Sequence, residues 1–192
     1  MFFNSQYLYI KEKMKNLKQF IKTTIREFLN ENFNDKYSNF KKNWIKDNSI
    51  GDLEIPKPFY INTYVFGYDE NDRATGYLVE MYYESKLIGT FHCFYNFNDS
   101  YEGADGVIND VELVENFRHK GFGKILTLKS IDVSNSLNGF YESDSRGVEP
   151  SQIKVYNSLK KNNIIDDYYR INYDLAQKLI NNVVNDFILD VN

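Results

Sequence analysis

The sequence predicts an α+β domain whose central mixed, mostly antiparallel sheet is flanked by helices. Three observations predict it: helical periodicity at both ends of the chain, a central run of β-rich segments, and a glycine loop that opens a helix directly after the last of these segments. With 192 residues, 42% of them hydrophobic, the chain can bury one substantial core. We expect a helical extension over residues 1–50 and one domain over residues 51–192.

Two helices are expected before the domain. Apolar residues recur at helical spacing over residues 17–29 and again over residues 33–44, where the second stripe ends at Trp44. Gly51, Pro56 and Pro58 then interrupt the helical pattern.

Strands are expected over residues 59–68, 76–84, 87–97 and 106–114, because these segments are rich in Tyr, Val, Ile and Phe. Polar runs separate them at 69–73 and 98–105. The remaining elements are expected as a helix near 122–137, a short strand over 140–143, a helix over 150–161 and an extended segment over 164–173. An extra C-terminal helix follows, where Asp174 and Gln177 have the spacing of a capping box.

Composition and charge exclude several classes of function. The net charge of −4 lacks the basic excess of nucleic-acid-binding proteins, so we expect no nucleic-acid partner. One cysteine, Cys93, can form no internal disulfide, and with two histidines it makes no four-ligand zinc site. No segment approaches the length of a membrane span, so we expect no membrane contact. The expectation is a cytoplasmic monomer or homodimer without a metal.

The stretch Val111–Lys124 carries the chemistry. Its strand enters a loop with Gly121 and Gly123 and then a helix. Such a loop can direct several backbone N–H groups to one point, where the start of the helix adds partial positive charge and the glycines let a pyrophosphate approach the main chain. Lys120 and Lys124 add positive charge at the rim. The stretch is neither a P-loop, which needs Ser or Thr after its lysine, nor a three-glycine Rossmann fingerprint.

Arg118-x-x-Gly121-x-Gly123 resembles the Gln/Arg-x-x-Gly-x-Gly/Ala coenzyme A signature of the GNAT family of N-acetyltransferases. Leu113 and Phe117 stand where that family has Val and Tyr, and the order of elements extends the resemblance over roughly residues 59–173. The resemblance implies acetyl-CoA as co-substrate and direct transfer of its acetyl group to a primary amine of a small molecule or protein. The implied coenzyme-binding residues are Val111, Leu113, Val114, Arg118, His119, Lys120, Gly121, Phe122, Gly123 and Lys124.

The resemblance also implies a general acid. The family often carries a tyrosine in the helix after its fifth strand, and Tyr156 falls at that position, where a phenol can protonate the leaving thiolate. Asn163-Ile164 stands in place of the Gly-Phe that follows in the family, and Glu149 replaces an upstream Asn. The alternative interpretation of Tyr156 is a packed core tyrosine.

A general base is sought among nearby carboxylates. Glu112 and Asp110 are two residues apart, so their side chains share one face of the fourth strand. Glu112 is preferred as the base because it lies nearer the expected splay of the strand. Glu142 and Asp144, beyond the short fifth strand, are alternatives. A pair of merely solvated carboxylates is the remaining interpretation.

Residues 14–31 resemble the leader of tailed-phage internal head proteins, in which Met-Lys precedes Phe-Ile and a Leu-x-Glu cleavage site follows. The matching residues are Met14-Lys15, Phe20-Ile21 and Leu29-Asn30-Glu31. This resemblance implies a phage protein in the host cytoplasm or the virion. It also gives the alternative function, a catalytically degenerate GNAT-fold structural or interaction protein of the virion. An amphipathic helix packed on the domain is the alternative interpretation of the segment.

Overall fold

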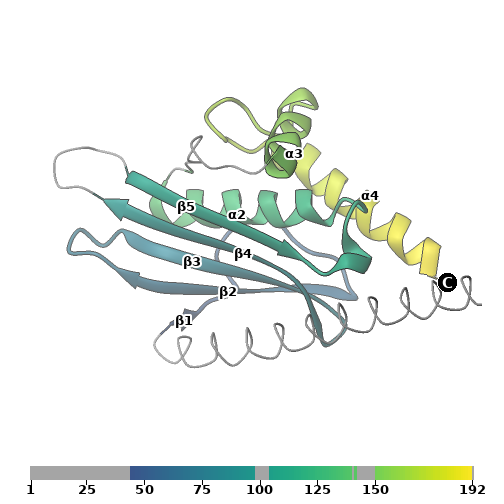
Figure 1. Ribbon diagram of the computed structural model, residues 1–192, viewed down its shortest axis with the longest axis horizontal. Coiled ribbons are helices and arrows are strands. Elements are labelled where there is room, and N and C mark those ends of the chain that lie inside the picture. Colours follow the sequence, from purple (N-terminus) through teal and green to yellow (C-terminus); the bar gives the residue numbers. More distant parts are fainter. Residues whose placement is uncertain (1–43, 98–103, 140, 142–149, 192) are drawn as a thin grey trace, which may run out of the picture. The chain divides into compact units, whose positions relative to one another are not determined.

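A computed structural model of the chain describes residues 44–97, 104–139, 141 and 150–191 (Figure 1). The chain divides into two units between Asn43 and Trp44, and the described residues all belong to the second unit. The helices predicted before residue 44 and the leader-like segment lie outside the described residues. They stay predictions, as does the domain boundary at residue 50.

The centre of the second unit is a five-stranded antiparallel sheet. Its order, β1-β2-β3-β4-β5, is also the order along the chain, so each strand pairs with its sequence neighbour. The polar run 69–73 therefore connects β2 and β3 as a hairpin, as predicted. The strands are β1 (Ile45–Lys46), β2 (Phe59–Tyr68), β3 (Ala74–Tyr83), β4 (Lys86–Phe97) and β5 (Ala104–Leu113).

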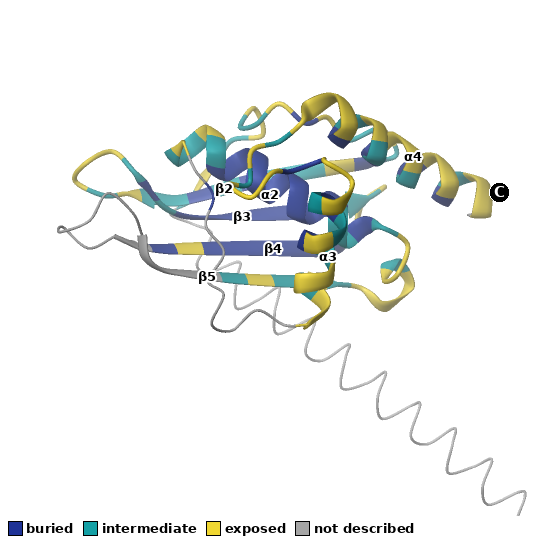
Figure 2. Cartoon of the chain, turned by 90° about the horizontal axis from the view of Figure 1, so that it is seen from above, coloured by how far each residue is buried: buried dark blue, intermediate teal, exposed yellow. Residues whose placement is uncertain are grey.

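Helices cover one face of this sheet (Figures 1 and 2). A short 3₁₀ turn, η2 (Glu115–Phe117), connects β5 to α2 (Phe122–Asn138), which packs on β3, β4 and β5. The other two helices are α3 (Pro150–Lys161) and α4 (Tyr173–Val191). Sheet and helices together confirm the predicted α+β class. Within the described part of the chain, no helix is long and apolar enough to cross a membrane.

The hydrophobic core lies between the sheet and α2, where Figure 2 shows the buried residues concentrated. Alternate residues of the central strands point to this side, as the period of two along a strand requires. Every residue of α2 from position 125 to 134 is buried, because the sheet covers one side of the helix and α3 and α4 approach the others. The main members are Phe59, Tyr77, Val79, Met81, Phe91, Ile125, Leu126, Leu128 and Ile131.

A buried ion pair ties three segments of the domain together. The Lys129 ammonium lies 2.9 Å from the Asp132 carboxylate, and both side chains are almost inaccessible to solvent. Asp132 also accepts the backbone N–H groups of Asp52 and Leu53 at 3.0 and 2.9 Å and the Tyr173 hydroxyl at 3.1 Å. The pair thereby joins α2 to the segment before β2 and to the start of α4.

Three local expectations were wrong. Trp44, predicted to end a helix, lies in a bend before β1 and packs on Phe66 with ring centroids 4.1 Å apart. The segment 164–173 forms a tight turn instead of an extended strand, because the Asp166 carboxylate accepts backbone N–H groups two and four residues later at 2.9 and 2.8 Å. Asn172, rather than Asp174, accepts an N–H group of the first turn of α4.

Candidate active site

The loop between β5 and α2 bends sharply twice. The backbone has a positive φ at His119 (62°) and again at Gly121 (93°), which is the N-cap of α2. This left-handed region favours glycine because a Cβ atom is strained there. The second bend therefore needs Gly121, and it turns the chain from the end of the sheet into the start of the helix.

The two glycines of the loop differ in what they are needed for. A Cβ atom on Gly121 would lie 2.7 Å from a methyl carbon of Val183, so α4 approaches this residue closely. A Cβ atom on Gly123 would meet only Leu113, at an ordinary 3.6 Å. The chain's own packing therefore requires a glycine at 121 but not at 123.

The start of α2 has no side-chain cap and no acidic residue in its first turn. The N–H of Lys124 donates to the carbonyl of Gly121 at 2.9 Å, while none of the described residues accepts from the N–H groups of Phe122 and Gly123. Unpaired N–H groups at a helix start carry partial positive charge and suit an anion. Arg118 and Lys120 are exposed in this loop, which adds two cationic groups at the same end of the helix.

On its inner side the loop is anchored by aromatic packing. The Phe122 side chain is fully buried, with its ring 5.3 Å from that of Phe187 on α4 and 4.9 Å from that of Phe59 on β2. The Phe117 ring lies 5.2 Å from the same Phe187 ring, and the Lys120 ammonium lies over the face of Phe187, 5.0 Å from its centroid. Phe122 can therefore offer a ligand only its backbone, because its side chain belongs to the core.

The edge of the sheet lies along β5. The N–H of Val114 donates to Ile88 on β4 at 2.9 Å, so the alternation of an antiparallel ladder turns the backbone groups of Val111 and Leu113 outward. A hydrogen bond agrees with this direction: Arg118 Nε, which lies outside the sheet, donates to the outward carbonyl of Leu113 at 2.8 Å. No described strand pairs with this edge, which leaves a row of backbone donors and acceptors beside the loop.

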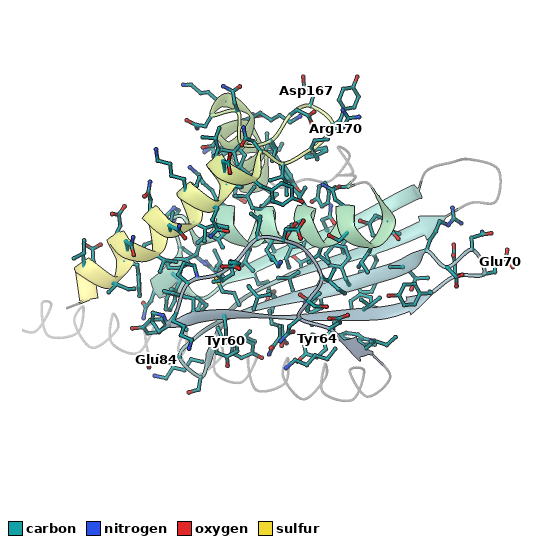
Figure 3. All side chains as sticks on the ribbon, turned by 180° about the vertical axis from the view of Figure 1, so that it is seen from behind. Tyr60, Tyr64, Glu70, Glu84, Asp167 and Arg170 are labelled. Carbon is teal, nitrogen blue, oxygen red and sulfur yellow. The ribbon has the colours of Figure 1, made fainter. Side chains whose placement is uncertain are left out.

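The two carboxylates of β5 project from the face of the sheet away from the helices. Asp110 lies in register with His92 on β4 and, through β3, with Tyr64 on β2, which points away from the helices in Figure 3. Glu112 is on the same face because side chains two residues apart share a side. Partial burial, and then the nearby Asp110 charge, raise the pKa of Glu112, whereas Arg118 opposes the shift.

Tyr156 lies on the other side of the sheet, within α3, and is only 6% exposed. Its hydroxyl is 2.5 Å from that of Tyr141, which in turn accepts a hydrogen bond from the Asn109 amide at 3.3 Å. Tyr156 is thus linked to β5 from the helix side, whereas Glu112 projects from the opposite side. The structure places these groups on the two faces of one edge strand and does not bring their side chains into contact.

Tyr141 and Asn109 were not singled out from the sequence. The sequence did hold one hint of Asn109: its side chain lies on the helix-facing side of β5, where the next two residues of that side, Val111 and Leu113, are apolar.

The alternative bases Glu142 and Asp144, together with Glu149, lie outside the described residues. No group of three or more His, Cys, Asp or Glu side chains in the described ranges is placed to hold a metal ion.

The Acetyltransferase (GNAT) family matches residues 33–157, which is more than half of the chain. The chain belongs to the GNAT family. The match includes the glycine loop and Tyr156 and ends before α4, so the helix that packs on Gly121 lies beyond the matched region. Comparison with curated proteins and with solved structures finds no significant match. GNAT membership confirms the resemblance drawn from the sequence and supports acetyltransferase activity in general, with acetyl-CoA as the usual co-substrate.

Proposed function

We propose that this GNAT protein transfers the acetyl group of acetyl-CoA directly to a primary amine of a small molecule or protein. The observation that carries the proposal is the continuity between the edge of β5, with which no strand of the described residues pairs, and the uncapped start of α2. The outward N–H and carbonyl groups of Val111 and the outward N–H of Leu113 suit the amide groups of a pantetheine arm, because an extended ligand can pair with a strand edge, while the Leu113 carbonyl is held by Arg118. The helix start beyond them suits a pyrophosphate.

The glycine at position 123 supports the same proposal. Neither packing nor a positive φ requires glycine there, since a Cβ atom would make only an ordinary contact. Close approach of a ligand to the main chain is a physical reason for a glycine at such a position. We assign the pyrophosphate to the backbone of Gly121–Lys124, with the exposed Arg118 and Lys120 supplying positive charge around it and His119 lying between them in the loop.

The proposed chemistry needs a base and an acid on opposite sides of the thioester. Glu112 takes a proton from the substrate ammonium, and its raised pKa brings the carboxylate closer to the pH at which a base is effective. The amine nitrogen then attacks the carbonyl carbon and a C–N bond forms. The nitrogen gives its second proton to solvent water, and the C–S bond breaks. The departing thiolate takes the proton of the Tyr156 hydroxyl, whose bonding electron pair stays on the tyrosine oxygen.

Coenzyme binding is tested by calorimetry with acetyl-CoA. A Gly123→Glu substitution places a carboxylate at the helix start, where it repels the pyrophosphate, and we expect binding to weaken at least a hundredfold. The matched control is Asn71→Glu, which adds the same charge to the exposed β2–β3 turn, near Glu70 at the far end of the sheet in Figure 3. Absence of acetyl-CoA binding to the unmodified protein, or equal binding by the two variants, contradicts the proposal.

The alternative is a GNAT-fold structural or interaction protein of a phage virion without transfer activity. The burial of Tyr156 and its hydrogen bond within the core favour this alternative. A screen of small-molecule and peptide amines with labelled acetyl-CoA separates the two functions: product formed with any amine, and lost in Tyr156→Phe, supports the enzyme. Binding of acetyl-CoA without product from any amine supports the structural protein.

A further inference from the structure

Tyr156 is one member of a hydrogen-bonded chain that begins on β5. The Asn109 amide nitrogen lies 3.3 Å from the Tyr141 hydroxyl oxygen, and that oxygen lies 2.5 Å from the Tyr156 hydroxyl oxygen. The chain crosses from the edge strand to α3 through a residue that follows α2. Each link joins residues that are distant in sequence, so the folded domain assembles the chain.

The direction of the hydrogen bonds in this chain decides how it affects the acidity of Tyr156. An amide nitrogen can only donate, so Asn109 uses a lone pair of the Tyr141 oxygen. Either hydroxyl can donate across the 2.5 Å contact with Tyr156, but when Tyr156 turns its own proton toward the thiolate, the proton in that contact is the one from Tyr141. A hydrogen bond donated to a phenol oxygen stabilises the charged phenolate more than the neutral phenol, and it therefore makes that phenol a stronger acid.

We infer that Tyr141 is a positioning residue, which donates a hydrogen bond to Tyr156 and so makes the Tyr156 phenol a stronger and better oriented acid toward the leaving thiolate. The inference rests on the proposed acetyl transfer. As the Tyr156 O–H bond breaks and an S–H bond forms, negative charge develops on the Tyr156 oxygen, next to the donated proton of Tyr141. Tyr156 regains its proton from solvent water before the next turnover.

The surroundings of Tyr141 suit a group that keeps its own proton. Burial raises the pKa of Tyr141 well above its ordinary value, and the charge and hydrogen bond of Tyr156 raise it further. The other titratable groups that act on it, Cys93 and Tyr95, are also buried and neutral when protonated. Tyr141 therefore remains a donor while Tyr156 cycles between phenol and phenolate.

A third tyrosine provides a matched control. The Tyr169 ring contacts the rings of Tyr141 and Tyr156 edge-on, with centroids 5.1 and 5.5 Å apart, and the Lys160 ammonium lies over the Tyr169 ring at 4.8 Å from its centroid. Within the described part of the chain, the Tyr169 hydroxyl is hydrogen-bonded to neither Tyr141 nor Tyr156. Tyr169→Phe thus removes one hydroxyl from the same aromatic cluster without removing the proposed donor.

The experiment labels tyrosine with ¹³C at the hydroxyl-bearing carbon and follows each resonance by NMR as the pH is raised. The Tyr156 signal is assigned from its loss in Tyr156→Phe. We expect Tyr141→Phe to raise the pKa of Tyr156 by about one unit, to move the alkaline limb of kcat upward with it, and to lower kcat about tenfold. Affinity for acetyl-CoA stays within twofold. Tyr169→Phe leaves all four quantities unchanged.

The outcomes separate this inference from the proposed function. A wild-type protein without transfer activity overturns the proposed function and the inference that rests on it. An active wild-type protein whose Tyr156 pKa and alkaline limb do not move in Tyr141→Phe overturns the inference alone. If Tyr141→Phe fails to fold, Asn109→Leu decides, since it keeps all three rings: a rise in the Tyr156 pKa supports the inference and an unchanged value overturns it.

Discussion

Replacing Gly121 by alanine tests whether α4 and a left-handed bend together hold the glycine loop. At φ 93° an alanine has its Cβ atom close to the following carbonyl oxygen, which costs about 1–2 kcal/mol. The same Cβ atom would lie 2.7 and 3.0 Å from the two methyl carbons of Val183. Overpacking of this kind costs about 1–3 kcal/mol. We therefore expect Gly121→Ala to lower the free energy of unfolding by about 2–5 kcal/mol, measured by urea denaturation.

Two further variants separate the causes. Gly139→Ala has the same left-handed requirement, at φ 76°, but a Cβ atom there meets nothing within 4 Å, so it measures the backbone cost alone, about 1–2 kcal/mol. Val183→Ala combined with Gly121→Ala removes the clash, and we expect a coupling free energy of about 1–3 kcal/mol between the two positions. Additive effects, with coupling below about 0.5 kcal/mol, would refute the contact between α4 and the loop.

Three other predictions concern buried and titratable groups. Asp132→Ala leaves the Lys129 ammonium buried without its carboxylate and should lower the free energy of unfolding by about 3–5 kcal/mol. Adding Lys129→Met to this variant should restore most of the lost stability. An equally large loss in the double variant would contradict the ion-pair argument. Because burial and the Asp110 charge raise the pKa of Glu112, kcat/KM should fall as pH drops through that raised pKa. Asp110→Asn should move this acid limb to lower pH, and an unmoved limb would exclude Glu112 as the base. Burial raises the pKa of the Cys93 thiol to about 12, so iodoacetamide should label it, as detected by mass spectrometry, only after unfolding in urea, and rapid labelling of the native protein would contradict its burial.

The sheet and helices could be predicted because their signals are local. Each β-rich segment is bounded by a polar run, and β2 and β4 begin and end at or within one residue of the predicted limits. The glycine loop was also predictable, since the bend at Gly121 and the helix start after it follow from neighbouring residues. The turn at 166–170 was missed because it depends on a single side chain. The Asp166 carboxylate accepts the backbone N–H groups of Tyr168 and Arg170, and this bends a segment that would otherwise be extended.

The partners of the loop and of Tyr156 could not be predicted, because they are brought together only by folding. Val183 approaches Gly121 from a helix far along the chain, and helical periodicity does not say which surface a helix will cover. Tyr141 meets Tyr156 and Asn109 across 15 and 32 residues of sequence. The same limit applies to Glu112: alternation put it on the face with Asp110, but only the sheet's register showed that this face is turned away from α2.

The edge of β5, which pairs with no strand in the described part of the chain, also bears on how the protein behaves in concentrated solution. Outward backbone groups at Val111 and Leu113 can template a strand from another molecule, which is the usual route to edge-to-edge aggregation, although the charges of Asp110 and Glu112 beside them discourage it. A coenzyme arm lying along this edge would occupy the same hydrogen-bonding groups. Acetyl-CoA would then act as a solubility factor as well as a substrate, and light scattering by the coenzyme-free protein should fall when it is added.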